Sequence, residues 1–254
     1  MRRKLGQHFL IDEKILDRMV QYGEVTENDV VLDVGAGRGE LTAKLAERAG
    51  KVIAVEVDRE LANEARKRLK DYDNVELLVG DVLKLRPGGF NKVVSNPPYS
   101  ISTKLLEWLI DEGVERIVLT LQKEFASKLM AKPGSMKYLY ISFLSNLFYD
   151  SNIVEFIPRN LFRPMPRVDS VIVLMKRKKD VQGLDEETKK FVKLLFTRRR
   201  QGLRHILRDL MKKKGLAADL LEVFGNKLLS KRVYQLTPSQ LLYISEKFLE
   251  LKAK

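Results

Sequence analysis

The chain of 254 residues contains no cysteine and only two histidines, His8 and His205. Disulfide bonds, thiolate zinc sites and a cysteine nucleophile are therefore excluded, and a histidine-based metal cluster or catalytic triad is not expected. The chain also lacks a run of about 18 apolar residues, the length that a transmembrane helix needs. Its basic start, MRRK, is not followed by the apolar segment of a signal peptide. We expect a cytoplasmic protein with no membrane partner and no metal.

Acidic residues are outnumbered by basic ones, and the excess is concentrated in one segment. The whole chain has 47 Lys and Arg against 34 Asp and Glu, a net charge of +13. Residues 176–214 alone contain 15 Lys and Arg against 5 Asp and Glu. Such a cluster favours a polyanion such as RNA as partner, although a solvated helix surface has the same composition. The residues that we expect to face phosphates are Arg198, Arg199, Arg200, Arg204 and Arg208.

The order of apolar patterns divides the chain into two parts. Strand-like runs alternate with helical patterns as far as a helix that begins near Lys123, which predicts a doubly wound α/β sheet. We expect this sheet to be mostly parallel, with an antiparallel strand near its end at residues 168–175, and we expect residues 140–148 to be extended. Helical spacing then dominates. The predicted domains are residues 1–180, the α/β domain, and residues 181–254, a small basic helical domain that binds RNA.

The first predicted strand, residues 30–34, ends at a glycine-rich turn, residues 35–40 (GAGRGE). A strand, a glycine turn and a helix in this order are typical of a nucleotide-type site, because glycines let a ligand approach the backbone. A dinucleotide site would have Gly or Ala where Glu40 stands, and the charge of Glu40 would repel a pyrophosphate. Asp33 is suited to bind an ammonium group. The pattern favours a cationic ligand without phosphates, such as S-adenosylmethionine; the alternative is a tight turn needed only for packing.

The next two predicted strands also end in acidic residues. Glu56 lies near the distance from the glycine turn at which an acid binds both ribose hydroxyls. Asp81 follows the strand at residues 75–79 and could accept a hydrogen bond from an adenine amine. Taken alone, Glu56 could be an ordinary helix-start charge and Asp81 a turn residue. Because ligands bind at the carboxyl ends of the strands in open α/β sheets, the three strand ends together favour a binding site.

The sequence Asn96-Pro97-Pro98-Tyr99 follows the apolar run at residues 92–94. These residue types suit the presentation of an exocyclic base amine to an electrophile: the Asn96 side-chain oxygen and the Pro97 carbonyl accept its hydrogens, and the prolines stiffen the backbone. Tyr99 can stack on the base, which is worth roughly 1–3 kcal/mol. Phe162 is either buried or placed opposite Tyr99. The alternative for the whole motif is a proline-rich turn that ends a strand.

With these motifs placed, nearly the whole chain resembles the small-subunit ribosomal RNA adenine N6,N6-dimethyltransferases. The matching segments are residues 6–10 (GQHFL), 33–39, 56, 80–81, 96–103, 162–170 and 196–207. The resemblance implies a Rossmann-like methyltransferase fold with S-adenosylmethionine as the methyl donor. The implied cofactor-binding residues are Gln7, His8, Leu10, Gly35, Gly37, Glu56, Asp81, Val82 and Asn96. The implied catalytic residues, around the target base, are Asn96, Pro97, Tyr99 and Phe162.

The resemblance also implies a substrate. It implies transfer of four methyl groups to two adjacent adenines in a hairpin near the 3′ end of small-subunit rRNA, within a pre-ribosomal small subunit, as a step of ribosome biogenesis. We expect the protein to act as a monomer. Bacterial members often have Asn at the position of His8 and Leu at that of Pro97, so this chain is similar to archaeal members. The alternatives are a macrolide-resistance type of large-subunit rRNA methylase, a DNA adenine methylase, and a ribosome-assembly factor whose binding matters more than its catalysis.

Overall fold

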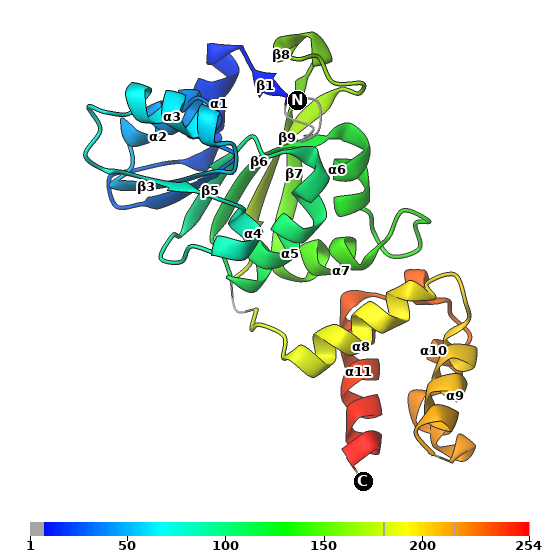
Figure 1. The fold of residues 1–254 in the computed structure, drawn as a ribbon. Helices are drawn as coiled ribbons and strands as arrows, with labels where there is room; N and C mark the ends of the chain where they lie inside the picture. The colour runs from blue at the N-terminus through cyan, green and yellow to red at the C-terminus, as the bar shows by residue number, and fades with distance from the viewer. Residues whose placement is uncertain (1–7, 180, 216, 254) are drawn as a thin grey trace. The chain divides into compact units, whose positions relative to one another are not determined.

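The computed structural model describes residues 8–179, 181–215 and 217–253. The chain forms two compact units (Figure 1). Unit 1 comprises Met1–Ala126 and Tyr149–Lys179, and unit 2 comprises Ser127–Phe148 and Asp180–Lys254. This grouping differs from a single division at residue 180, because the segment Ser127–Phe148 packs with the C-terminal helices.

Unit 1 contains a seven-stranded sheet in the order β4-β3-β2-β5-β6-β9-β7. Its strands are β2 (Val30–Val34), β3 (Lys51–Glu56), β4 (Val75–Val79), β5 (Lys92–Ser95), β6 (Arg116–Gln122), β7 (Tyr149–Ile157) and β9 (Ser170–Arg177). The neighbouring strands β4, β3, β2, β5 and β6 are parallel to one another, and β9 is antiparallel to both β6 and β7. The predicted doubly wound sheet with an antiparallel strand near its end is therefore confirmed. The central strands are mostly apolar because helices cover both faces of the sheet.

The helices of this part of the chain follow the strands as the alternation predicts. They are α1 (Glu13–Gly23), α2 (Glu40–Ala46), α3 (Arg59–Arg68), α4 (Val82–Leu85), α5 (Ser102–Asp111) and α6 (Lys123–Leu129), with 3-10 turns at Tyr99–Ile101 and Arg159–Leu161. Helices α1, α2 and α3 lie on one face of the sheet, and α4 and α5 on the other (Figure 1). Asp12 and Asp58 accept hydrogen bonds from the first turns of α1 and α3, which fixes where these helices begin.

The N-terminal apolar segment is held by a short antiparallel ladder. Strand β1 (Phe9–Leu10) pairs with β8 (Phe162–Arg163), with Leu10 opposite Phe162. Both of these side chains are buried in the core cluster that α1 and α2 form with the sheet. The ladder places the backbone of His8 beside the loops that follow β2 and β5.

Unit 2 is helical. It contains α7 (Tyr140–Phe148), α8 (Glu186–Thr197), α9 (Leu203–Lys213), α10 (Asn226–Leu229) and α11 (Pro238–Ala253), with 3-10 segments at Ala218–Phe224 and Val233–Gln235. The prediction that residues 140–148 are extended is wrong. Six of the nine residues of α7 are buried, and its sequence is a short, mostly apolar segment in which helix and strand look alike. Among the described residues, no helix is both long and apolar enough to cross a membrane.

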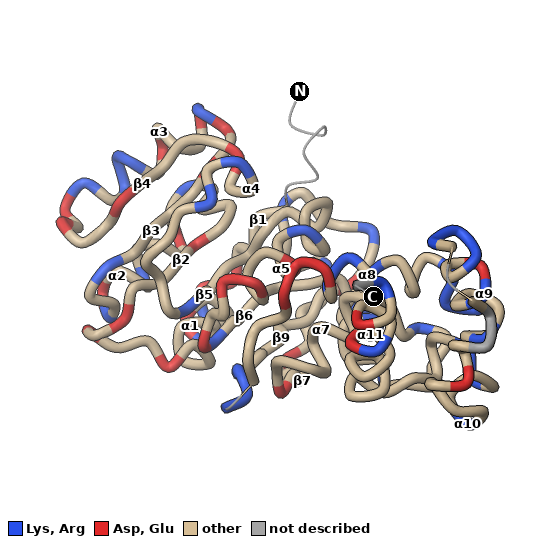
Figure 2. Tube along the Cα trace, turned by 90° about the horizontal axis from the view of Figure 1, so that it is seen from below, with Lys and Arg blue, Asp and Glu red and all other residues tan. Residues whose placement is uncertain are grey.

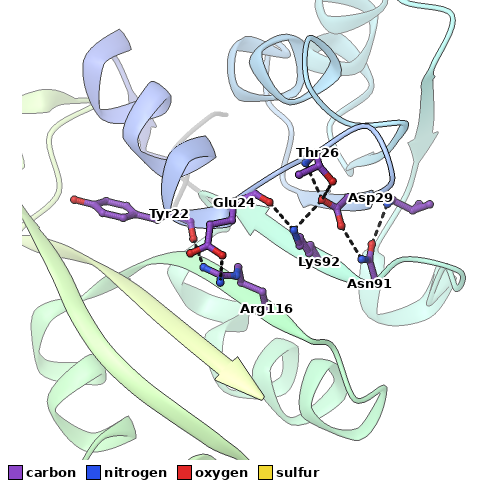
Figure 3. Close-up of polar contacts among 8 residues, drawn as sticks. Tyr22, Glu24, Thr26, Asp29, Asn91, Lys92 and Arg116 are labelled. Carbon is purple, nitrogen blue, oxygen red and sulfur yellow. Dashed lines mark hydrogen bonds and ion pairs between the residues drawn. The ribbon is translucent and has the colours of Figure 1, made fainter. Parts of the chain in front are cut away.

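The amino edge of the sheet, where β2, β5 and β6 begin, contains a network of buried charges (Figure 3). Asp29 accepts hydrogen bonds from the Lys92 ammonium at 2.8 Å, the Asn91 amide at 2.8 Å and the Thr26 backbone and hydroxyl groups. Burial alone would raise the pKa of Asp29, but these donors together lower the pKa to about 2. The network therefore holds an ionised carboxylate inside the fold.

A second set of contacts ties the end of α1 to the same edge. Lys92 also donates to the Glu24 backbone oxygen, and Arg116 donates to the Tyr22 backbone oxygen and pairs with the Glu24 carboxylate (Figure 3). Lys92 and Arg116 are thus both bound by protein partners, which suits a structural role.

Candidate active site at the carboxyl edge of the sheet

The glycine turn after β2 brings two other segments close to its backbone. Gly35 and Gly37 have φ of +75° and +60°, which side-chain-bearing residues rarely adopt. A β-carbon on Gly35 would lie 3.0 Å from the Pro98 ring, and one on Gly37 would lie 3.1 Å from the Phe9 ring. These glycines are needed because the loop after β5 and the N-terminal strand both pack against the turn.

Glu56, at the end of β3, has its carboxylate held by the backbone. One oxygen accepts from the Gly37 N–H at 2.8 Å and the other from the Asp58 N–H at 2.9 Å. The residue is 2% exposed, and burial raises the pKa of Glu56 although these backbone bonds act in the opposite direction. Each oxygen keeps a second lone pair, so the carboxylate is oriented to accept two hydroxyl groups from a ligand.

The ends of β2, β3 and β4 line one cavity of about 170 Å³ together with the loop and 3-10 turn that precede α5. Its lining residues include Gly35, Glu56, Asp81, Val82 and Ile101. One oxygen of Asp81 caps α4 by accepting from the Leu83 N–H at 3.0 Å, so Asp81 is a turn residue and also has an oxygen left for a ligand. The structure thus brings the acidic strand ends together, as the parallel arrangement predicts.

The loop after β5 begins with a firmly held amide. The Asn96 amide nitrogen donates to the His8 backbone oxygen at 3.2 Å, and its amide oxygen accepts from the Thr120 hydroxyl. Pro97 is buried beside it. Asn96 and Pro97 line a small cavity together with His8, Gly35 and Glu56 and with Phe9, Pro98 and Tyr99. The predicted amine-binding residues therefore lie next to the predicted cofactor residues.

The Tyr99 ring is held in a defined orientation. Its hydroxyl lies 2.5 Å from the Ser170 hydroxyl on β9, and its ring stacks against the His8 ring at 5.8 Å between centroids. The His8 ring is held in turn by its Nδ1 atom, 2.7 Å from the Pro164 carbonyl oxygen. Burial raises the pKa of Tyr99, so the phenol stays neutral at physiological pH. His8 thus contributes both its ring and its backbone to the site.

Asp33 lies beneath the glycine turn and is 1% exposed. Its carboxylate accepts from the Thr42 hydroxyl at 2.7 Å. Burial, which outweighs this bond, and the charge of Glu56 raise the pKa of Asp33 to about 7. Residues that line a hollow beside it include Leu10, Gly35, Gly37, Glu40 and Asn96. A cation bound in that hollow would relieve the cost of burying this carboxylate.

Two of the predicted site residues stand differently from the rest. The Phe162 ring is 0% exposed and belongs to the core cluster, so the buried alternative describes it and it presents no face to a base in this structure. The reason is its pairing opposite Leu10, which turns the ring into the core. Gln7 lies outside the described residues. The sequence did not indicate that the hydroxyls of Thr120 and Ser170 contact site residues. For Thr120 a signal exists, because it is a polar residue within the apolar run of its strand.

The sequence profile of a family described as "Ribosomal RNA adenine dimethylase" matches residues 1–246. The chain belongs to this family. It is 38% identical over 248 residues to the "Probable ribosomal RNA small subunit methyltransferase A" of the archaeon Pyrococcus abyssi, covering 96% of this chain and 90% of that protein. It is also 38% identical over 250 residues to the "Ribosomal RNA small subunit methyltransferase A" of Thermotoga maritima, covering 98% and 85%. The enzyme is thus a methyltransferase, and the matches span most of the length of both relatives.

A solved structure extends the likeness to the fold of the whole dimethylase. The crystal structure of a dimethyladenosine transferase from Plasmodium falciparum matches with a TM-score of 0.83 and 28% sequence identity, covering 96% of this chain and 98% of that one. The match includes the helical C-terminal region as well as the sheet, so the two units together are the fold of this kind of enzyme.

The methyl donor of the family is S-adenosylmethionine, and the site fits it. The two oriented oxygens of Glu56 suit the two ribose hydroxyls, and the free oxygen of Asp81 suits an adenine amine. Gly35 lines both cavities at the place where its turn packs against Pro98. The hollow beside Asp33 offers a carboxyl group, and a cationic ligand end bound there would favour its ionised form. Among the described residues there is no group of three or more His, Asp or Glu side chains placed to hold a metal ion.

The predicted RNA-binding arginines lie at the end of α8 and along α9, where basic residues gather (Figure 2). Arg198 is bound to Asp209 at 2.6 Å and to Gln201, and Arg199 is partly buried. The other three are exposed: Arg200, Arg204 and Arg208. Arg204 also donates to the Asn226 side-chain oxygen at 2.6 Å. Arg200 and Arg208 are therefore better placed to contact phosphates than Arg198, whose guanidinium is paired with Asp209.

Proposed function

We propose that this enzyme transfers methyl groups from S-adenosylmethionine to the N6 atoms of two adjacent adenines in a hairpin near the 3′ end of small-subunit rRNA, with N6,N6-dimethyladenosine as product. The observation that carries the proposal is the meeting of Glu56, Asp81, Asn96 and Pro97 at one edge of the sheet. The names of the relatives, which specify the small subunit, support the choice of RNA.

The cofactor would be held by residues from four strand ends and the N-terminal segment. Glu56 would accept the ribose hydroxyls and Asp81 the adenine amine, while Val82 contributes an apolar wall. The remaining contacts are assigned to His8, Leu10, Gly35, Gly37 and Asn96, with Gln7 as a further expected contact. The sulfonium of S-adenosylmethionine supplies an already activated methyl group, so the protein needs to position the amine rather than to create a nucleophile.

The target adenine would be presented by Asn96, Pro97 and Tyr99. The amine nitrogen is conjugated with the purine ring, and hydrogen bonds from its protons to the Asn96 amide oxygen and the Pro97 carbonyl draw its lone pair out of that conjugation. The neutral ring of Tyr99 provides a stacking surface that is independent of the number of methyl groups. A monomethylated amine still has one hydrogen for one acceptor, so a second transfer can follow the first.

The RNA would be bound by the exposed arginines at the end of α8 and along α9, and the substrate would be the pre-ribosomal small subunit rather than free duplex. We further propose that the enzyme acts as a monomer in the cytoplasm. A role in ribosome biogenesis follows from that substrate.

The test is incubation of the enzyme and S-adenosylmethionine with small subunits that lack the modification, followed by nuclease digestion and nucleoside mass spectrometry. Dimethyladenosine in the 3′-terminal fragment is the expected product, and the Glu56→Ala variant serves as the control. A product that stays at the monomethyl stage under excess cofactor would favour a DNA-type monomethylase. Modification of large-subunit rRNA instead would favour the macrolide-resistance type, and subunit binding without methylation would favour an assembly factor.

A further inference from the structure

The side-chain amide of Asn96 is held at both of its ends. The amide nitrogen donates to the His8 backbone oxygen at 3.2 Å, and the amide oxygen accepts from the hydroxyl of Thr120 on β6. The first contact comes from the N-terminal segment and the second from inside the sheet. Rotation of the amide is therefore opposed from two independent directions.

The chemistry of these partners also determines which end of the amide is which. The His8 carbonyl oxygen can only accept a hydrogen bond, so the amide NH2 group must face it. If the amide were turned over, its oxygen would face this carbonyl oxygen and the two would repel. Thr120 therefore meets the amide oxygen and must be the donor. The hydroxyl occupies one lone pair of that oxygen and leaves the other for a ligand in the adjoining cavity.

The position of Thr120 in the sheet explains how it reaches Asn96. Strand β5 pairs with β6 as far as Ser95 opposite Leu119, so Asn96 and Thr120 follow the last paired residues of the two strands. Thr120 is 0% exposed and stands in the apolar run of β6 between Leu119 and Leu121. A buried hydroxyl is costly unless it is hydrogen-bonded, so a threonine in this run is best explained by the bond that it makes.

We propose that Thr120 is a positioning residue for methyl transfer: its hydroxyl keeps the Asn96 amide oxygen directed at the target amine. The inference rests on the proposed role of Asn96 as an acceptor of that amine. Thr120 does not touch substrate or cofactor in this scheme. It acts on the rate through Asn96, because an acceptor that is already oriented needs no reorganisation when the transition state forms.

The experiment compares three variants at this position. Thr120→Val replaces the hydroxyl by a methyl group of similar size, Thr120→Ala removes it by truncation, and Thr120→Ser keeps it. We expect kcat for methylation to fall about tenfold in the Val and Ala variants. We expect S-adenosylmethionine affinity by calorimetry and KM for the ribosomal substrate to change less than about twofold, and Thr120→Ser to recover most of the rate. Equal rate loss in the Ser variant, or unchanged kcat in the Val and Ala variants, would overturn the inference.

A double variant separates action through Asn96 from a general effect on the sheet. In single-turnover reactions with excess enzyme, Thr120→Val should cost little further rate when Asn96→Ala is already present, because the group that Thr120 orients is gone. Additive losses would assign Thr120 to sheet packing alone. If Asn96→Ala itself reacts at the parent rate, the proposed role of Asn96 fails as well. If Asn96→Ala is slow but Thr120→Val is not, only the role of Thr120 fails.

Discussion

The two ends of β2 hold buried aspartates in opposite electrostatic settings. At the amino edge, Asp29 is bound by the Lys92 ammonium, and its pKa is lowered to about 2. At the carboxyl edge, four residues along the same strand, Asp33 is bound by the neutral Thr42 hydroxyl, and burial raises its pKa to about 7. Glu56 beside it is bound by backbone N–H groups, and burial raises its pKa too.

The difference separates carboxylates that stabilise the fold from carboxylates that bind. A built-in cation satisfies Asp29 permanently, so that charge is not available to a ligand. Neutral donors orient Asp33 and Glu56 without neutralising them, so a cationic or hydroxylic ligand can complete their environment. Perturbed carboxylates in a cleft are typical of functional sites for this reason. The comparison predicts that variants at the two edges change different properties.

The largest effect is expected for Lys92→Met at the amino edge. The Lys92 and Asp29 side chains are 12% and 7% exposed, so removing the ammonium leaves a buried charge without its counterion. We expect the free energy of unfolding at pH 7 to fall by about 3–5 kcal/mol, while cofactor affinity stays unchanged. Urea denaturation and calorimetry measure the two quantities. A loss of S-adenosylmethionine affinity in a folded variant would contradict the separation of the edges.

The pH dependence and a control sharpen this prediction. Because the folded pKa of Asp29 is depressed, its stabilising contribution is present above the unfolded pKa of about 4 and is lost as the pH falls toward 2. The difference between Lys92→Met and the parent should therefore shrink over that range. Lys51→Met is the matched control: its pair with Glu76 is about half exposed on both sides, and we expect a loss below about 1 kcal/mol.

At the carboxyl edge, we expect Asp33→Asn to raise the free energy of unfolding, whereas Lys92→Met lowers it. The folded pKa of Asp33 is raised, so the parent loses stability as the pH rises from about 4 through about 7. The variant has no such titration and can still accept from the Thr42 hydroxyl. We expect it to be more stable than the parent at pH 8 by roughly 4 kcal/mol, with the two converging near pH 4, and to bind S-adenosylmethionine less tightly. If the free energy of unfolding of the parent did not change between pH 4 and pH 8, the pKa of Asp33 would not be raised in the folded protein, which would contradict this prediction.

These contrasts show which parts of the site the sequence could predict. Gly35, Glu56, Asp81 and Asn96 each lie at or just after the end of a strand. Because parallel strands end at the same edge, their convergence follows from the alternation of elements alone. The partners that hold them are different. Ser170 reaches Tyr99 only because β9 is antiparallel to β6, and no local pattern specifies that pairing.

The same limit explains the wrong or incomplete predictions. A strand and a buried helix have similar composition when all their faces are covered, so α7 (Tyr140–Phe148) could not be distinguished from an extended segment. The direction of the Phe162 ring depends on its register opposite Leu10, 152 residues earlier in the chain. Long-range register and side-chain contacts decide these points, and a single sequence leaves them open.

A smaller effect is expected for Glu56→Ala, which removes the oriented carboxylate. Charge-assisted hydrogen bonds to the ribose would be lost, and we expect S-adenosylmethionine affinity to fall by at least about tenfold. The free energy of unfolding should not fall with the affinity, because burial of the ionised Glu56 carboxylate is itself unfavourable. Calorimetry with the cofactor measures the affinity, and Glu60→Ala, at an exposed position of α3, is the control. Equal affinity in Glu56→Ala would place the ribose elsewhere.

The smallest effect concerns unit 2, where paired and exposed charges can again be compared. Arg198 is bound to Asp209, whereas Arg208 on α9 is exposed. If paired charges stabilise and exposed charges bind, Arg208→Ala should weaken RNA binding a few-fold at low salt and lower the slope of log affinity against log salt by about 0.9, the value for one phosphate contact on a duplex. Arg198→Ala should leave that slope unchanged, since its guanidinium is already paired with Asp209.

Titrations of a small-subunit rRNA hairpin between about 50 and 200 mM salt, a range over which phosphate contacts change affinity strongly, measure both slopes. Equal slope changes in the two variants would mean that Arg198 leaves Asp209 for a phosphate when RNA binds, and the distinction between paired and exposed arginines would not hold in this unit.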